Sequence, residues 1–79
     1  MDTQEINTKL KAILVKSLGV DESEITPSAD IMNDLGADSL DCVEIVCDIE
    51  SQFKITIPDE DAEKLLTPAD WVRYLEGRV

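Results

Sequence analysis

The sequence contains no histidine and only two cysteines, Cys42 and Cys47. The usual base of a serine nucleophile is therefore missing, and so is the commonest nitrogen ligand of zinc. The carboxylates lack the spacing and the central glycine of a calcium loop, which leaves only weak, non-specific association of divalent cations with the acidic stretch. We therefore expect no metal site and no enzymatic activity, and a small hydrolase has little support.

Basic residues are also scarce: 7 lysines and arginines stand against 18 acidic residues, giving a net charge of −11. Nucleic acid is an unsuitable partner, because phosphate binding needs a basic surface. Eleven of the acids lie between Asp30 and Glu63, where Lys54 is the only base. This concentration predicts a surface for basic protein partners, and the alternative is that the charge only keeps the protein soluble.

Aromatic residues and long apolar runs are few as well, since the only aromatics are Phe53, Trp71 and Tyr74. A core of Leu, Ile and Val in 79 residues is enough for one small domain over residues 1–79, which we expect to be a monomer. Cys42 and Cys47 are five residues apart on one expected helix and cannot pair with each other. Without a signal segment or a membrane-spanning run, we expect a cytoplasmic protein with no membrane insertion.

The apolar residues that are present recur mainly at helical spacing. A first helix is expected from the capping box of Asp2 and Glu5 to Gly19, and a second over residues 39–52. A short third helix is expected from Asp59 as N-cap to residue 65, and a fourth from Thr67 to Gly77. Residues 20–37 read as a long loop, and residues 54–57 as an extended link. The expected fold is all-α, a small four-helix bundle of three longer helices and one short helix, with a long loop between the first two.

The start of the second helix is the most informative stretch. Gly36 allows a tight turn, Asp38 is placed as the N-cap, and Asp41 follows three residues later as in a capping box. Ser39 is then the first helical residue. Because unpaired N–H groups and the helix dipole favour an anion at this end, a phosphate ester on Ser39 suits the position.

The string Asp-Leu-Gly-Ala-Asp-Ser-Leu-Asp at residues 34–41 resembles the prosthetic-group attachment motif of acyl carrier proteins. The resemblance extends to residues 57–60 and over nearly the whole chain. It implies that a phosphopantetheinyl transferase (holo-ACP synthase) attaches 4′-phosphopantetheine from coenzyme A to Ser39, beside Asp38. The resemblance also implies that acyl thioesters are then presented to fatty acid synthesis enzymes and acyltransferases with basic docking patches.

The apolar stripe of the second helix is wider than burial requires. The resemblance implies that Leu40, Val43 and Cys47 face partners while Val46, Ile49 and Phe53 face the core. The alternative is a broad face that is wholly buried. The residues expected to bind partners are Leu40, Asp41, Val43, Glu44, Cys47, Asp48, Glu50, Asp59, Glu60 and Glu63. The candidates for lining an acyl pocket, whose spacing by itself indicates only a core, are Val46, Ile49, Ile57, Ala62, Leu65 and Leu66.

Two further functions remain open from the sequence. One is a carrier for a specialised pathway, whose cargo is a polyketide, a modified lipid or an amino acid. The other is an acidic helical interaction module that carries nothing. Cys42 stands one turn after Ser39, where simple packing is the favoured interpretation and a redox-sensitive thiol is the alternative.

Overall fold

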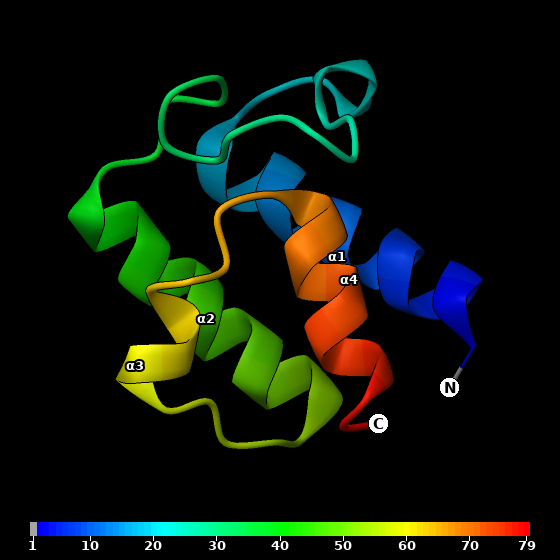
Figure 1. The fold of residues 1–79 in the computed structure, drawn as a ribbon. Coiled ribbons are helices and arrows are strands. Elements are labelled where there is room, and N and C mark those ends of the chain that lie inside the picture. The colour runs from blue at the N-terminus through cyan, green and yellow to red at the C-terminus, as the bar shows by residue number, and fades with distance from the viewer. Residues whose placement is uncertain (1) are drawn as a thin grey trace.

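The computed structural model describes residues 2–79, and this range contains helices and no strand. The elements in chain order are α1 (Thr3–Leu18), the 3₁₀-helix η1 (Glu22–Glu24), α2 (Ser39–Phe53), α3 (Asp59–Ala62) and α4 (Pro68–Glu76). Helix α1 packs against both α2 and α4, and the long loop before α2 covers one end of the bundle (Figure 1). The predicted all-α fold of three longer helices and one short helix is confirmed.

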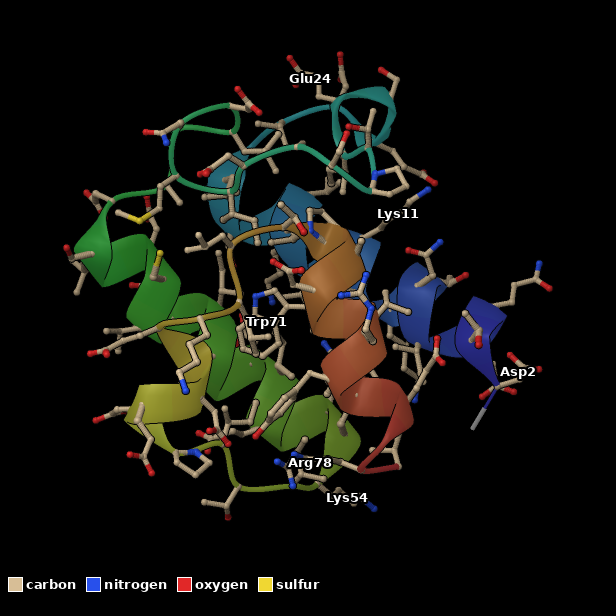
Figure 2. All side chains as sticks on the ribbon, viewed as in Figure 1. Asp2, Lys11, Glu24, Lys54, Trp71 and Arg78 are labelled. Carbon is tan, nitrogen blue, oxygen red and sulfur yellow. The ribbon has the colours of Figure 1, made fainter. Side chains whose placement is uncertain are left out.

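The core forms where three amphipathic helices meet. The buried side chains are Ile6, Leu10, Ile13 and Leu14 from α1, Ile45, Ile49 and Phe53 from α2, and Trp71 and Leu75 from α4. Each fully buried aliphatic or aromatic side chain contributes about 1.5 to 3 kcal/mol of hydrophobic free energy. Figure 2 shows Trp71 inside the molecule, whereas the charged residues labelled there lie around its periphery.

The helix ends follow the capping signals of the sequence. Oδ1 of Asp2 accepts the N–H of Glu5 at 2.8 Å, and Oγ1 of Thr67 accepts the N–H of Asp70 at 3.2 Å. Gly19 ends α1 in the left-handed conformation, with φ of 67°. The predicted bounds of the first and fourth helices are therefore correct to within a residue.

The expected third helix is wrong in its start and its length. Asp59 is the first helical residue, and Pro58 occupies the N-cap position with its carbonyl accepting the N–H groups of Asp61 and Ala62. From Lys64 on, the hydrogen bonds span three residues, as in Leu65 N–H to Ala62 O at 3.1 Å, so the chain continues in single turns. One helical turn is too short to be stable by itself, and tertiary contacts therefore set its length.

The long loop is fixed to the rest of the fold by burial and by backbone hydrogen bonds. Ile25, Ile31 and Leu35 are buried, and Val20 is half-buried. The N–H of Ile31 donates to the carbonyl of Leu66 at 2.9 Å, and a second bond joins Ala69 to Pro27. The loop is thereby held against the segment between α3 and α4 and against the first turn of α4.

Two smaller features complete the chain. The 3₁₀-helix η1 was not expected from the sequence. Its start is capped by the N–H of Asp21, which donates to Oε2 of Glu24 at 2.9 Å. The acid three residues after Asp21 is the sequence signal that indicates such a turn. Residues 54–57 form an extended link in which Ile57 is buried.

Within residues 2–79, no helix combines the length and the apolar character that crossing a membrane requires.

Candidate functional site

The start of α2 leaves an exposed hydroxyl beside unpaired backbone donors. Oδ1 of Asp38 accepts the N–H of Asp41 at 2.8 Å, and Oδ2 of Asp41 accepts the N–H of Asp38 at 3.2 Å, as the sequence predicts. Ser39 and Leu40 are the first two helical residues, and their N–H groups take part in no hydrogen bond within residues 2–79. Ser39 is exposed. An anionic group on its hydroxyl is therefore favoured by the helix end.

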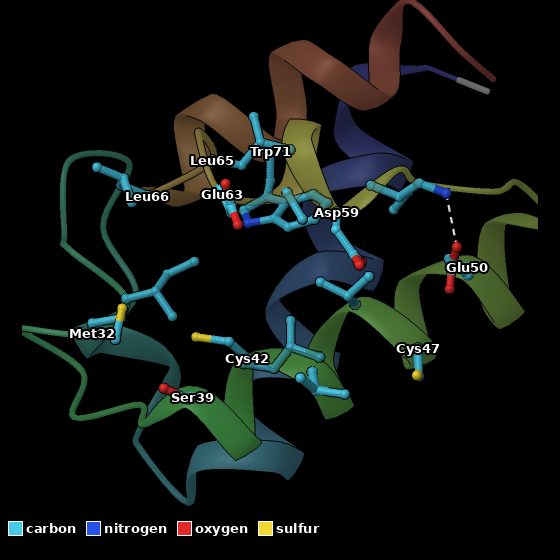
Figure 3. Close-up of a pocket in the computed structure, with 16 residues that line it drawn as sticks. Met32, Ser39, Cys42, Cys47, Glu50, Asp59, Glu63, Leu65, Leu66 and Trp71 are labelled. Carbon is cyan, nitrogen blue, oxygen red and sulfur yellow. Dashed lines mark hydrogen bonds between the residues drawn. The ribbon is translucent and has the colours of Figure 1, made fainter.

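A cleft of about 620 Å³ opens beside Ser39. Its volume falls in the range of about 300 to 1,000 Å³ that is usual for small-molecule sites. Its walls come from the long loop, α2, α3 and the start of α4 (Figure 3). The lining residues are Ile31, Met32, Ser39, Cys42, Val43, Ile45, Val46, Cys47, Glu50, Ile57, Asp59, Ala62, Glu63, Leu65, Leu66 and Trp71.

Most of the side chains expected around an acyl group lie along this cleft. Val46, Ile57, Ala62, Leu65 and Leu66 all line it. Ile49 does not, because it has no exposed surface and packs in the core.

Sequence reasoning missed other lining residues, among them Ile31, Met32, Cys42 and Trp71. They come from three different segments, the long loop, α2 and α4. Their place in the cleft depends on how these segments pack together, and no local pattern in the sequence indicates it.

One side of α2 is apolar and open to solvent. Leu40 and Val43 are 67% and 58% exposed, and Cys47 is also exposed, whereas Ile49 and Phe53 are buried. The alternative of a broad face that is wholly buried is therefore wrong. The exposed apolar side chains stand next to the acids of the same helix, which is the arrangement expected of a docking surface.

The acids around this face are largely without cationic partners. The two salt bridges formed within residues 2–79 join Arg73 to Asp70 and Arg78 to Asp61, and neither involves α2. Glu44, Asp59, Glu60 and Glu63 are exposed, while Asp41, Asp48 and Glu50 are half-buried. Within the described part of the chain, no three acidic or thiol side chains are grouped closely enough to hold a metal ion. The negative charge is therefore available to a basic surface.

Glu50 has a structural contact in addition to its place in the predicted partner surface. Its Oε2 accepts the N–H of Ile57 at 2.7 Å. This bond joins the last turn of α2 to the extended link before α3, and both residues line the cleft (Figure 3). Glu50 therefore holds one wall of the cleft in place.

The two cysteines lie in different surroundings, and both are free thiols. The Cys42 side chain points into the cleft (Figure 3), and its pKa is raised above the ordinary value of 9.0, first by burial and then by the charges of Asp41 and Asp38. Cys47 is exposed.

The comparison with known families agrees with this geometry. A family model described as a phosphopantetheine attachment site matches residues 8–75, a range that contains Ser39 and every residue of the cleft. Members of the family bind 4′-phosphopantetheine covalently. The exposed Ser39 hydroxyl, the unpaired N–H groups beside it and the adjoining apolar cleft fit a phosphodiester with a long substituent. Since the match covers most of the chain, this protein belongs to the family of phosphopantetheine-carrying carrier proteins.

Proposed function

We propose that this protein is an acyl carrier protein that carries acyl chains on 4′-phosphopantetheine attached to Ser39 and presents them to enzymes of fatty acid biosynthesis. The observation that carries this proposal is the exposed hydroxyl of Ser39 at the start of α2, next to a largely apolar cleft. When bound, the prosthetic group supplies a terminal thiol on which acyl groups are held as thioesters. The protein itself positions the prosthetic group and provides the surface that partner enzymes recognise.

Ser39 acts as an acceptor rather than as a catalytic nucleophile in this proposal. The chain has no histidine to activate the hydroxyl, so the base comes from the transferase. Oγ of Ser39 loses its proton and forms a phosphodiester, while the pyrophosphate bond of coenzyme A breaks and the adenosine bisphosphate half leaves. The unpaired N–H groups of Ser39 and Leu40 favour the phosphate that results.

Asp38 has a positioning role in the proposal. Its carboxylate caps α2 and accepts the N–H of Asp41 at 2.8 Å, so that Ser39 is presented in the first helical turn. The reciprocal bond from Asp41 fixes the backbone on the other side of Ser39. The hydroxyl is therefore offered to the transferase in a defined orientation.

The open face of α2 is the proposed docking surface for the transferase and the synthesis enzymes. Leu40 and Val43 supply an apolar centre, and the flanking carboxylates meet Lys and Arg of the partner. Each exposed ion pair is worth only about 0 to 1 kcal/mol, so several together speed association without making a tight complex. A carrier that visits several enzymes needs this weak binding.

The decisive experiment is intact mass spectrometry before and after incubation with coenzyme A, magnesium and a broad-specificity phosphopantetheinyl transferase. We expect one phosphopantetheinyl addition to the wild-type chain and none to Ser39→Ala. Ser51→Ala is the matched control, because Ser51 is an exposed serine on the same helix, and it should be modified like the wild type.

The outcomes also separate the other candidate functions. The absence of any addition, under conditions that modify a known carrier, would favour an acidic interaction module, which the unneutralised face of α2 also fits. If the addition occurs, the acyl group on protein isolated from its own source decides between fatty acid synthesis and a specialised pathway.

A further inference from the structure

The cleft contains one strong hydrogen-bond donor that has no partner. Trp71 is the only tryptophan of the chain, and only 3% of the residue is exposed. Within residues 2–79, its indole N–H donates to no protein atom. Twelve hydrogen bonds there involve side chains, and none of them includes the indole. Buried indole N–H groups usually have a partner. Without a protein acceptor, this N–H is left to water or to a group that enters the cleft.

The indole N–H is open to the cleft. Figure 3 shows the indole on the opposite side of the cleft from Cys42, and in this view its nitrogen lies beside the carboxylate of Glu63. No side-chain nitrogen or oxygen in the described residues is both sealed from solvent and unpaired, so Nε1 of Trp71 is reached through the cleft. The donor therefore faces whatever occupies the interior of the cleft.

The indole is held rigidly in this orientation. Trp71 lies in the first turn of α4, whose start is fixed by the Thr67 cap and by Pro68. Its ring packs edge-to-face against Tyr74, with centroids 6.2 Å apart and an interplanar angle of 78°. A donor that is already oriented costs little to use when cargo enters.

We propose that Trp71 determines cargo preference, and that the cleft favours acyl chains bearing a hydroxyl or keto oxygen that accepts a hydrogen bond from the indole N–H. This inference rests on the proposed carrier function. A cleft that only buries hydrocarbon would place no requirement on the polar groups of the cargo, whereas this proposal requires an oxygen that accepts a hydrogen bond.

The remaining polar groups of the cleft favour a neutral oxygen over a carboxylate. Glu50, Asp59 and Glu63 line the cleft and repel a negatively charged chain end. The Cys42 thiol is only a weak donor. A hydroxyl or keto group is therefore the acceptor that matches both the indole and its surroundings.

The preference arises mainly from the cost of leaving the donor unpaired. A hydrocarbon chain that fills the cleft displaces water from Nε1 and offers no acceptor in return, whereas an oxygenated chain replaces the lost hydrogen bond. A net hydrogen bond of ordinary strength corresponds to a preference of about 2- to 10-fold in the ratio of cleft-bound to solvent-exposed cargo.

The test uses the full chain loaded through Ser39 with amide-linked coenzyme A analogues. One analogue carries an octanoyl group, and a series carries octanoyl groups hydroxylated at successive carbons. The indole ¹H–¹⁵N resonance and the fluorescence report on Trp71 alone, because the chain has no other tryptophan. We expect at least one hydroxylated chain to move the indole N–H resonance downfield and to be about 2- to 10-fold more cleft-bound than octanoyl.

Two variants serve as controls. Trp71→Phe keeps an aromatic ring and removes the donor, so it should load normally and lose the preference for the hydroxylated chains. Glu63→Ala removes a carboxylate that lines the cleft and also belongs to the expected partner surface, so it is loaded to completion before the comparison and should then retain the preference. Circular dichroism verifies that both variants are folded. If Trp71→Phe does not fold, the indole resonance of the wild type with octanoyl and with hydroxylated chains still tests the proposal.

The outcomes separate this proposal from the carrier function. If intact mass shows no loading of the wild type, the carrier function itself fails. If loading occurs and the indole N–H has the same chemical shift with every hydroxylated chain as with octanoyl, the carrier function stands and the role of Trp71 is overturned. A loss of the preference in Glu63→Ala would also overturn it, because the carboxylate would then be the selecting group.

Discussion

The two thiols of α2 show how strongly one helix can vary the chemistry of identical side chains. Cys42 faces the cleft, where burial and the neighbouring Asp41 and Asp38 raise its pKa, while Cys47 is exposed on the proposed docking surface. The thiolate is the reactive form of cysteine. A raised pKa makes Cys42 a poor candidate for a redox-sensitive thiol and supports its interpretation as a packing residue.

We predict that iodoacetamide alkylates Cys47 before Cys42 at neutral pH. The raised pKa of Cys42 leaves less thiolate there, so its alkylation should accelerate as the pH rises through and beyond 9.0, its ordinary value. Peptide mass mapping of Cys42→Ser and Cys47→Ser follows each thiol separately. Faster alkylation of Cys42 at neutral pH would contradict the environment described for it.

A second residue-scale prediction concerns Glu50. Glu50→Ala removes the acceptor of the Ile57 N–H and should lower the free energy of unfolding by about 1 to 3 kcal/mol, as expected for losing a charged hydrogen-bond partner. Urea denaturation measures this change, and the Ile57 amide should exchange faster with solvent. The control is Glu44→Ala, an exposed acid on the same helix, whose effect should stay within about 0.5 kcal/mol.

At the scale of elements, the short helix α3 is joined to α4 by a side-chain cluster. The hydroxyl of Tyr74 donates to Oδ2 of Asp61 at 2.8 Å, and Arg78 lies 3.5 Å from the same oxygen. The Arg78 guanidinium also stacks over the Tyr74 ring, 4.3 Å from its centroid. These contacts fix a single-turn helix that has too few hydrogen bonds of its own to persist.

The Tyr74 hydroxyl gives this junction a predictable pH dependence. The pKa of Tyr74 is raised above the ordinary value of 10.0, first by burial and then by its hydrogen bond to Asp61, despite the opposing charge of Arg78. Because the folded state holds the proton more tightly, the stabilisation is complete below pH 10.0 and is lost as the pH rises through the folded-state pKa.

We therefore predict that Tyr74→Phe lowers the free energy of unfolding by about 0.5 to 1.5 kcal/mol at neutral pH, the usual value of one hydrogen bond. The difference between wild type and variant should shrink above pH 10.0, where the phenol begins to ionise in the unfolded chain. Urea denaturation of both proteins across this range measures it. A difference that is constant with pH would show that the hydroxyl is not coupled to Asp61 as described.

At the scale of the whole molecule, electrostatic repulsion opposes folding. The net charge is −11, and eleven of the acids lie between Asp30 and Glu63 with Lys54 as the only base among them. The salt bridges formed within residues 2–79 lie outside α2, so this helix keeps its charge uncompensated. The same uncompensated charge leaves the proposed docking surface free for a basic partner.

We predict that the melting temperature rises with ionic strength between about 10 and about 150 mM salt, over which the Debye length falls from about 30 to about 8 Å. Neutralising one acid, as in Glu44→Gln, should reduce this salt dependence. Differential scanning calorimetry at matched pH measures both effects. A melting temperature that is flat across this range would mean that repulsion among the acids does not limit stability.

The sequence by itself determined the features that depend on neighbouring residues. The caps at Asp2, Asp38 and Thr67, the left-handed Gly19 and the place of Ser39 at the start of α2 all follow from patterns a few residues long. Such interactions form between groups that the local backbone already brings together, and so they can be predicted without knowing the fold.

Only the tertiary structure decided which faces became buried and which became the cleft. The apolar stripe of α2 did not indicate that Ile49 belongs to the core while Val46 lines the cleft, and nothing near Trp71 indicated that its N–H lacks a partner. The length of α3 and the bond from Glu50 to Ile57 were likewise set by packing. Burial depends on contacts between segments far apart in the chain, which local periodicity does not contain.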